Sequence, residues 1–475
     1  MDRPPPTIRP NGILAVLAAA GIVAALMQTL VVPLIGDLPR LLNTTASNAT
    51  WAITATLLSA AVAVPIAGRL GDMYGKRRML LISTFPLIAG SALCAMASGI
   101  VPMIVGRGLQ GVGMAIVPLG ISAMRDLLPP ERLGSSIALM SSSMGIGGAF
   151  GLPLAAAVAQ NSSWRVLFWA ATVTCVVVAV LIWMFIPATE LTTAAGRFDY
   201  LGALGLGIGL VCLLLAISKG AVWGWSSGTT LGLFAAAVVM LAVWGWWELR
   251  ITAPLVDLRV TARPQVLLTN AAAVVVGFAM YAQSLIVPQL MQLPKATGYG
   301  LGQSMLAMGL WMAPSGLVMT AVAPLGARLS AARGPKVTLI AGSLVIALGY
   351  ASSLVLMGSA AGLALVTCIS SAGIGMAYGT LPALIMGAVP RSETAAANSF
   401  NTLMRSIGTS TAAAVVGVVL SQMSIHMGSH TLPSENGFRV GLLIGCGAAL
   451  AAAAITVAIP VRRTAAPEPR SMSRV

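Results

Sequence analysis

The chain has very little charge. Asp, Glu, Lys and Arg make up 8% of its 475 residues, against about 25% in soluble proteins. Hydrophobic residues make up 57%, and the mean hydropathy is +0.92. There is too little polar material to cover a water-facing surface, which excludes an ordinary soluble fold, and the high hydrophobicity excludes disorder. The composition is typical of a helical protein that crosses the membrane many times.

Residues that carry enzyme or metal chemistry are also scarce. The only two histidines, His426 and His430, fall between apolar runs, and the five cysteines include no CxxC pair, so we expect no metal site and no catalytic residue. No P-loop, HExxH or GxSxG pattern occurs. Because ATP cannot drive such a chain and no cofactor is expected, an ion gradient or the gradient of a transported molecule must supply any energy. A membrane receptor or enzyme is a remote alternative, since the longest predicted loop, 249–266, is short.

Apolar runs long enough to cross a bilayer are what the sequence does contain. A span needs about 20 mostly apolar residues, and the runs are too long for tilted barrel strands, so we predict helices. The fourteen predicted spans are 13–34, 51–70, 79–98, 101–123, 136–159, 164–187, 201–218, 229–248, 267–290, 302–325, 337–357, 360–388, 396–422 and 438–460.

The basic residues predict the orientation of these spans. With the N-terminus inside, 20 Lys and Arg fall in inside segments, 5 fall in outside segments, and Arg107 and Arg405 lie within spans. Lys and Arg collect in cytoplasmic loops. We therefore predict a multi-pass protein of the cytoplasmic membrane with both termini in the cytoplasm.

Short sequence matches reveal an internal repeat. GRLGDMYGKR (68–77) resembles ARLSAARGPK (327–336), GVGMA (111–115) resembles GIGMA (373–377), and SMG (143–145) resembles SIG (406–408). The offsets, 259 to 263 residues, skip eight spans. We therefore predict an all-α membrane protein with two six-helix halves, 1–190 and 263–460, an inserted two-helix linker, 191–262, and a cytoplasmic tail, 461–475.

The loop after the second span carries the most specific motif, GRLGDMYGKRR at 68–78. Its glycines allow a tight turn and close helix approach. This motif resembles the signature loop of the major facilitator superfamily, and fourteen spans with an extra pair between the halves resemble its fourteen-span drug:proton antiporter branch. The resemblance implies a gating motif formed by Gly68, Gly71, Asp72, Gly75, Lys76 and Arg77.

That resemblance implies a function. We expect a secondary transporter that exports lipophilic small molecules, drugs or similar, as in multidrug efflux and antibiotic resistance. It is expected to use proton antiport with alternating access and to work as a monomer. Asp72 is expected to lock the inward side. The second copy has Ala331 at that position, so the gate should be asymmetric. A dedicated exporter of an endogenous lipid or secondary metabolite remains an alternative, and the direction of transport is open.

Proton coupling has three candidates. Arg107 and Gln110 in the fourth span match the R-x-x-Q-G-x-G proton-transfer motif of the family, and a charge inside a span is a functional hypothesis by default. The acid usual inside the first span is missing. All twelve acids lie at span ends or in loops, and Asp37 at the outer mouth is the best remaining proton carrier.

The fifth span carries Gly147, Gly151 and Pro153, which resemble the antiporter motif that shapes the contact between halves, although a Gly-Leu-Pro sequence replaces the usual Gly-Pro.

Polar residues inside spans are candidates for the transport cavity. Asn398, Asn401 and Arg405 share one helix face. With no carboxylate in mid-span, we expect neutral or anionic lipophilic cargo. The full set of cavity candidates is Gln28, Thr29, Asn270, Gln283, Trp311, Asn398, Asn401 and Arg405.

Overall fold

The computed structural model describes residues 10–31, 34, 37–187, 197–427 and 430–460. The predicted tail, 461–475, lies outside them. Fourteen helical segments of the described chain are long and apolar enough to cross a membrane, which confirms the predicted all-α bundle with two six-helix halves and an inserted pair. The helices are α1 Pro10–Thr29, α2 Leu38–Leu41, α3 Ala46–Ala49, α4 Trp51–Tyr74, α5 Lys76–Ala95, α6 Ile100–Gly113, α7 Ile116–Leu127, α8 Pro130–Asn161, α9 Arg165–Phe185, α10 Tyr200–Trp223, α11 Gly228–Glu248, α12 Leu258–Thr261, α13 Pro264–Gln292, α14 Met305–Arg333, α15 Pro335–Leu356, α16 Ala360–Met386, α17 Thr394–Gln422 and α18 Glu435–Val457, with single 3-10 turns at Lys295–Thr297 and Arg391–Glu393.

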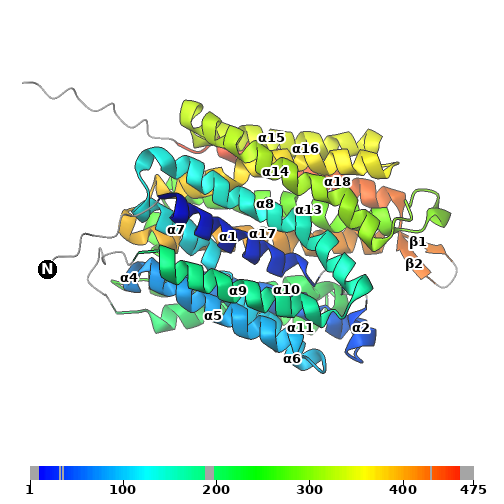
Figure 1. Ribbon diagram of the computed structural model, residues 1–475, viewed down its shortest axis with the longest axis horizontal. Coiled ribbons are helices and arrows are strands. Elements are labelled where there is room, and N and C mark those ends of the chain that lie inside the picture. The colour runs from blue at the N-terminus through cyan, green and yellow to red at the C-terminus, as the bar shows by residue number, and fades with distance from the viewer. Residues whose placement is uncertain (1–9, 32–33, 35–36, 188–196, 428–429, 461–475) are drawn as a thin grey trace, which may run out of the picture.

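Two departures from the expected helices stand out. The fourth span is broken into α6 and α7 at Met114 and Ala115, where the backbone makes tighter turns. The segment before α18, expected as a loop, forms a small antiparallel hairpin, β1 Ser424–Met427 with β2 His430–Pro433. In Figure 1 this hairpin lies at the end of the bundle opposite the start of α1. We call it the hairpin end, and we call the opposite end, where α4 meets α5 at Gly75, the motif end.

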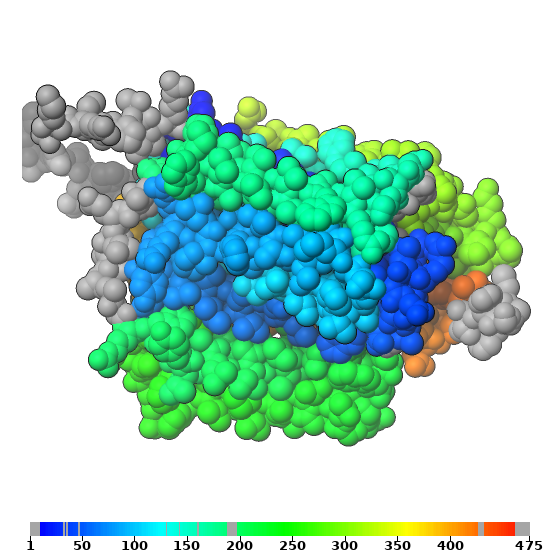
Figure 2. Space-filling model, turned by 60° about the horizontal axis from the view of Figure 1, so that its bottom comes forward, coloured from blue at the N-terminus to red at the C-terminus, as the bar shows by residue number. Residues whose placement is uncertain are grey.

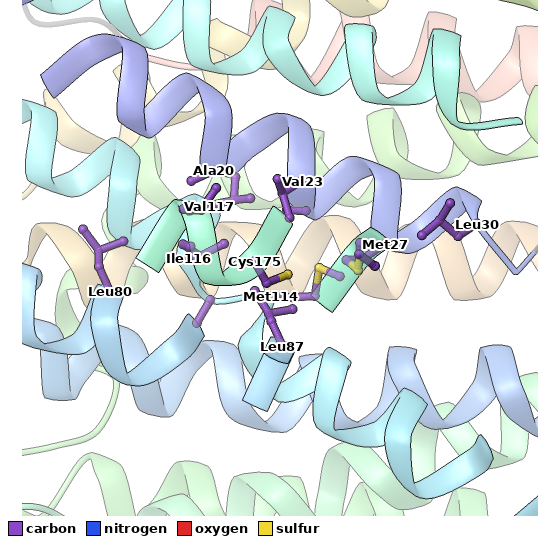
Figure 3. Close-up of a cluster of buried hydrophobic side chains, with 14 of the residues drawn as sticks. Ala20, Val23, Met27, Leu30, Leu80, Leu87, Met114, Ile116, Val117 and Cys175 are labelled. Atoms are coloured by element: carbon purple, nitrogen blue, oxygen red, sulfur yellow. The ribbon is translucent and has the colours of Figure 1, made fainter. Parts of the chain in front are cut away.

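Each half has its own apolar core. In the first half, buried side chains from α1, α5, the α6–α7 span and α9 interdigitate, and Figure 3 shows Val23 and Met27 of α1 facing Met114 and Leu87. In the second half, α13, α15, α16, α17 and α18 enclose a separate cluster around Tyr350 and Phe438. The first cluster also includes Met386 and Ala395 of the second half, and Met144 of the first half packs against the second cluster, so the two cores touch at the boundary between the halves.

The inserted pair packs across the boundary between the halves. Helices α10 and α11 pair with each other, and α10 also contacts α4 of the first half and α17 of the second. A shared cluster holds Leu210 of α10 with Ala61 of α4 and Leu403 of α17. Figure 2 shows the pair in green along the lower face, beside the blue helices. The other boundary between the halves is formed mainly by α8 and α14.

Candidate functional site: the gate and the buried polar clusters

The signature loop is a single-residue turn. Helix α4 ends at Tyr74, α5 starts at Lys76, and Gly75 between them has φ 92° and ψ 135°, a conformation that favours glycine. Gly334 occupies the equivalent turn of the second half with φ 88° and ψ 158°. The sequence repeat therefore reflects the same backbone turn in both halves.

Asp72 connects the two halves at the motif end. Its carboxylate accepts hydrogen bonds from the backbone N–H groups of Ala395, at 3.1 Å, and Ala396, at 2.9 Å, in the first turn of α17. The free N–H groups and the helix dipole make such an N-terminus a good site for a negative charge. The Asp72 side chain is 2% exposed, and Lys76 Nζ lies 3.8 Å away. Asp72 therefore joins α4 to α17 in a largely dry contact.

Lys76 and Arg77 brace the loop within the first half. Lys76 Nζ donates to Asp126 at the end of α7 while facing Asp72. Arg77 donates to the carbonyl oxygen of Trp183 in α9 at 2.6 Å. These two cations therefore tie the loop to neighbouring spans of the same half. Asp72, by contrast, contacts α17 of the second half.

Two glycines let α4 approach its neighbours at this point. A methyl group on Gly68 would lie 2.6 Å from Ser399 Cβ and 2.7 Å from the carbonyl oxygen of Ala395, closer than real Cβ atoms come. One on Gly71 would press into Leu119 and lie 3.7 Å from Ala395 Cβ. Glycine at 68 is therefore what permits Asp72 to reach the α17 terminus.

Arg125 makes a second bond set between the halves, which the sequence did not predict. From α7, its guanidinium donates to Thr394 Oγ1 at 2.7 Å and to the carbonyl oxygen of Val389 at 3.2 and 3.3 Å. In the sequence, Arg125 is one of many basic residues near span ends, and nothing marks its partners. Together, Asp72 and Arg125 close the motif end around the start of α17.

Arg107 is buried in the first half, with 2% exposure, and its Nε and Nη1 atoms donate to neutral acceptors. It donates to the carbonyl oxygens of Met27, at 2.8 Å, and Ala52, at 3.0 Å, and to Gln110 Oε1 at 2.6 Å. Gln110 in turn donates to Ser91 Oγ at 2.8 Å. Arg107 and Gln110 thus link α6 to α1, α4 and α5, and no carboxylate lies in this network among the described residues.

Arg405 has a different environment, in α17. Its guanidinium carbon lies 4.3 Å from the centre of the Tyr378 ring of α16, a cation–π contact. Beside it, Asn401 donates to Asn270 Oδ1 of α13 at 2.8 Å. Asn398 is buried with neither side-chain polar atom hydrogen-bonded in the described structure, and the same holds for Gln283 Oε1. These groups leave unused hydrogen-bonding capacity inside the second half.

The remaining candidates are scattered. Asp37 is exposed and lies 3.8 Å from the exposed Arg40. Gln28 reaches Met114 Sδ at 3.8 Å, and Thr29 donates back into α1 at 3.1 and 3.3 Å. Trp311 is 39% exposed. The structure does not bring the eight cavity candidates into one cluster. Only Asn270 of that set lines the cavity of about 130 Å³ at the motif end.

The residues of the fifth-span motif contact two different helices, α1 of the first half and α14 of the second half. Methyl groups on Gly147 and Gly151 would collide with α1, the first 2.6 Å from Ala25 Cβ, so these glycines serve packing within the first half. Pro153 faces α14, where a methyl on Gly309 would lie 3.2 Å from it. The close contact between halves is made by Gly145 of α8 against Gly316 of α14, where a methyl on Gly145 would lie 2.9 Å from the Gly316 carbonyl oxygen. Sequence reasoning missed this pair because small residues are abundant.

With this geometry described, comparison with known proteins decides the family. The family model of the Major Facilitator Superfamily matches residues 17–413. The chain belongs to this superfamily. It is therefore a multi-pass membrane transporter and not an enzyme. An uncharacterised MFS-type transporter of Mycobacterium tuberculosis is 30% identical over 314 residues, which cover 65% of this chain and 45% of that protein, so the chain spans less than half the length of that relative.

Two further matches cover more of the chain. The multidrug transporter protein MdtP of Bacillus subtilis is 25% identical over 423 residues, 88% of this chain and 76% of MdtP. The crystal structure of the human organic anion transporter MFSD10 matches with a TM-score of 0.66 and 14% identity, over 95% of this chain and all of that one. The second match shows the shared superfamily fold.

Proposed function

We propose that this protein exports lipophilic small molecules across the cytoplasmic membrane by proton antiport, as a monomer with its motif end and both termini in the cytoplasm. The observation that carries the proposal is the closure of the motif end by Asp72 and Arg125, whose polar contacts join the two halves there. A set of contacts that is strong but few in number can be broken and remade as the halves rock. Similarity to a multidrug transporter supports the drug-like cargo.

A groove on the side of the bundle supports uptake from the lipid phase. It has a volume of about 680 Å³, lies between α4, α5 and α10, and its walls include Ile66, Ile82, Phe85 and Val211. This volume is in the range of small-molecule sites, about 300 to 1,000 Å³. An apolar groove open to the bilayer suits a lipophilic molecule that partitions into the membrane before it is exported.

The charges inside the bundle favour neutral or anionic cargo. Arg107 and Arg405 are both buried, and the described structure pairs neither with a carboxylate. A permanently cationic molecule near them would be repelled with little screening from solvent. A neutral or anionic molecule avoids that repulsion.

The test is transport in proteoliposomes under an imposed pH gradient, with neutral, anionic and cationic lipophilic dyes. We expect gradient-driven movement of neutral and anionic dyes, loss of it in Asp72→Asn, and full activity in Glu435→Gln, whose exposed partner is Arg439. Asp37→Asn tests the proposed proton carrier, and loss of coupling is expected. Movement that ignores the gradient would refute antiport, and a single accepted compound would favour a dedicated exporter.

A further inference from the structure

Two buried acids lie at the motif end of the inserted pair. Asp199 precedes α10 and accepts a hydrogen bond from the backbone N–H of Gly202 at 2.8 Å. Glu248 is the last residue of α11. Asp199 is 5% exposed and Glu248 2%. Acids at span ends are normally solvated, so this burial needs an explanation.

The two carboxylates meet over Gly202. A methyl group at that position would lie 2.8 Å from Glu248 Oε1 and in collision with Asp199 Oδ2. Both oxygens therefore lie close to one α-carbon of α10, and only glycine leaves room for them. The site is built by the pairing of α10 with α11.

The partners of this pair are neutral. Trp244 Nε1 donates to Glu248 Oε1 at 2.9 Å, and Trp247 Nε1 donates to Asp199 at 3.2 Å. Glu248 Oε2 is buried and has no hydrogen-bond partner in the described part of the chain. Within those same residues, no lysine or arginine lies in salt-bridge range of either acid.

The nearby charged groups are engaged elsewhere or lie outside salt-bridge range of the pair, as does the exposed Arg197 two residues before Asp199. Arg250 stacks on Trp246 at 4.1 Å, and Arg259 donates to the Leu249 carbonyl oxygen at 2.8 Å. Asp257 caps α12. Lys219 lies at the other end of α10, where it contacts Thr50 and Trp51. Arg69 of α4, a helix packed against α10, lines the cavity whose wall includes Leu255 and Val256. None of these neutralises the acid pair.

Two buried carboxylates that both lie close to the Gly202 α-carbon, with no cation in salt-bridge range among the described residues, cannot both be ionised at an acceptable cost. One proton held by the pair removes the repulsion, because only one of the two acids is then charged. We propose that Asp199 and Glu248 together bind one exchangeable proton, which makes the inserted pair a proton-binding site. The indole N–H groups orient the two acids so that they share it.

This site touches the gate through one short segment. The backbone amides of Leu255 and Val256 lie beside the Glu248 carboxylate. The same two residues line the motif-end cavity together with Arg69 and Ala396. The backbone N–H of Ala396 is one of the two that donate to Asp72. A change of charge on the acid pair therefore acts on a segment that contacts the closed gate. The proton site stands without the proposed export, and only its use in coupling rests on that function.

The experiment uses the full chain in lipid nanodiscs without cargo. Infrared difference spectra between mildly acidic and mildly alkaline pH should show loss of one protonated carboxyl band in the wild type, with a matching change in tryptophan fluorescence from Trp244 and Trp247. Glu248→Gln should abolish both signals, since its amide can donate to Asp199 at every pH. Asp199→Asn keeps the helix cap and should shift the titration of Glu248 toward acid by about one pH unit or more, because the like charge is gone. Glu435→Gln is the matched control and should leave both signals unchanged.

The outcomes that overturn the proposal are specific. An unchanged carboxyl band in Glu248→Gln would place the proton elsewhere. A signal that depends on sodium against choline and not on pH would make this a cation site. The link to the gate is measured by amide hydrogen exchange at alkaline pH. Exchange at Leu255 and Val256 should be several-fold slower in the wild type than in Glu248→Gln, because an ionised carboxylate accepts these N–H groups more strongly than a neutral amide does. Equal rates would refute the link. Because no cargo is present, failure of the export proposal cannot produce any of these results.

Discussion

Asp72 of α4 accepts the backbone N–H of Ala396 of α17 at 2.9 Å, and the two residues belong to opposite halves of the transporter. The acceptor is a buried carboxylate and the donor is the end of a helix, so the bond combines charge, dipole and hydrogen-bond geometry. It also has no counterpart in the second half, where Ala331 occupies the position equivalent to Asp72. This contact at the motif end is thus made by only one of the two sequence repeats.

Asp72→Asn should weaken this lock. The amide keeps one acceptor oxygen but loses the charge, and a hydrogen bond to a charged group contributes about 1.5–3 kcal/mol. We expect hydrogen exchange at Ala395 and Ala396 to rise roughly tenfold. The N-terminus of α16, capped by Ser359 at 3.0 Å, serves as the internal reference. Unchanged exchange at Ala395 and Ala396 would contradict the lock.

Gly68→Ala should hold the gate open by steric conflict. The added methyl meets Ser399 and the Ala395 carbonyl oxygen, so transport should fall several-fold. Ser399→Gly removes the nearest side-chain atoms and should restore part of the loss in the double variant. Gly148→Ala is the control, because its methyl would meet nothing within 4 Å. The absence of rescue would show that the Ser399 side chain is not the obstacle.

Gln110→Leu should destabilise the first half. It removes the acceptor of Arg107 at 2.6 Å and leaves a buried guanidinium short of one bond, at a cost of about 1–3 kcal/mol in the free energy of unfolding. Gln110→Glu retains an acceptor and should cost less. Gln422→Leu, at an exposed helix end, should be neutral. The measurement is thermal unfolding in detergent, and equal melting temperatures for Gln110→Leu and the wild type would count against the network.

Gly408→Ala should disturb the packing of α17 against α13. Its methyl would overlap the Val274 carbonyl and lie 3.0 Å from Phe278 N, and overpacking of this kind costs about 1–3 kcal/mol. Gly417→Ala lies in the same helix, meets nothing within 4 Å and should be neutral or slightly stabilising. The comparison is again made by thermal unfolding. Equal effects of the two substitutions would show that helix propensity, and not the contact with α13, determines the change in stability.

The sequence predicted the features that depend on local pattern. Fourteen spans follow from apolar runs, and a tight turn after the second span follows from the glycines of its repeated motif, at Gly75 and Gly334. Each needs information from one segment or from two copies of the same segment. That is why composition and spacing were sufficient for them.

The features that were missed depend on how distant segments fold back. Arg125 bonds residues 264 and 269 positions away, and such a contact exists only when the halves close. The sequence shows Asp199 and Glu248 only as two of twelve acids at span ends or in loops, with nothing to mark them as neighbours. In the structure Asp199 and Glu248 are buried, and the buried segment at Leu255 and Val256 helps to cover them. Asp37, expected at the outer mouth, is exposed beside Arg40, and its role as a proton carrier stays a prediction.

The position of the inserted pair makes the two flanks of the transporter chemically different. Along α8 and α14 the halves pack directly on each other, and Gly145 and Gly316 bring the backbones together there. Along α4 and α17 the pair α10–α11 stands between the halves and the bilayer. In the proposed rocking motion, the first flank changes contacts between α8 and α14 alone, whereas α4 and α17 of the second flank also move against α10. Membrane composition and tension should therefore act on the cycle from one side more than from the other.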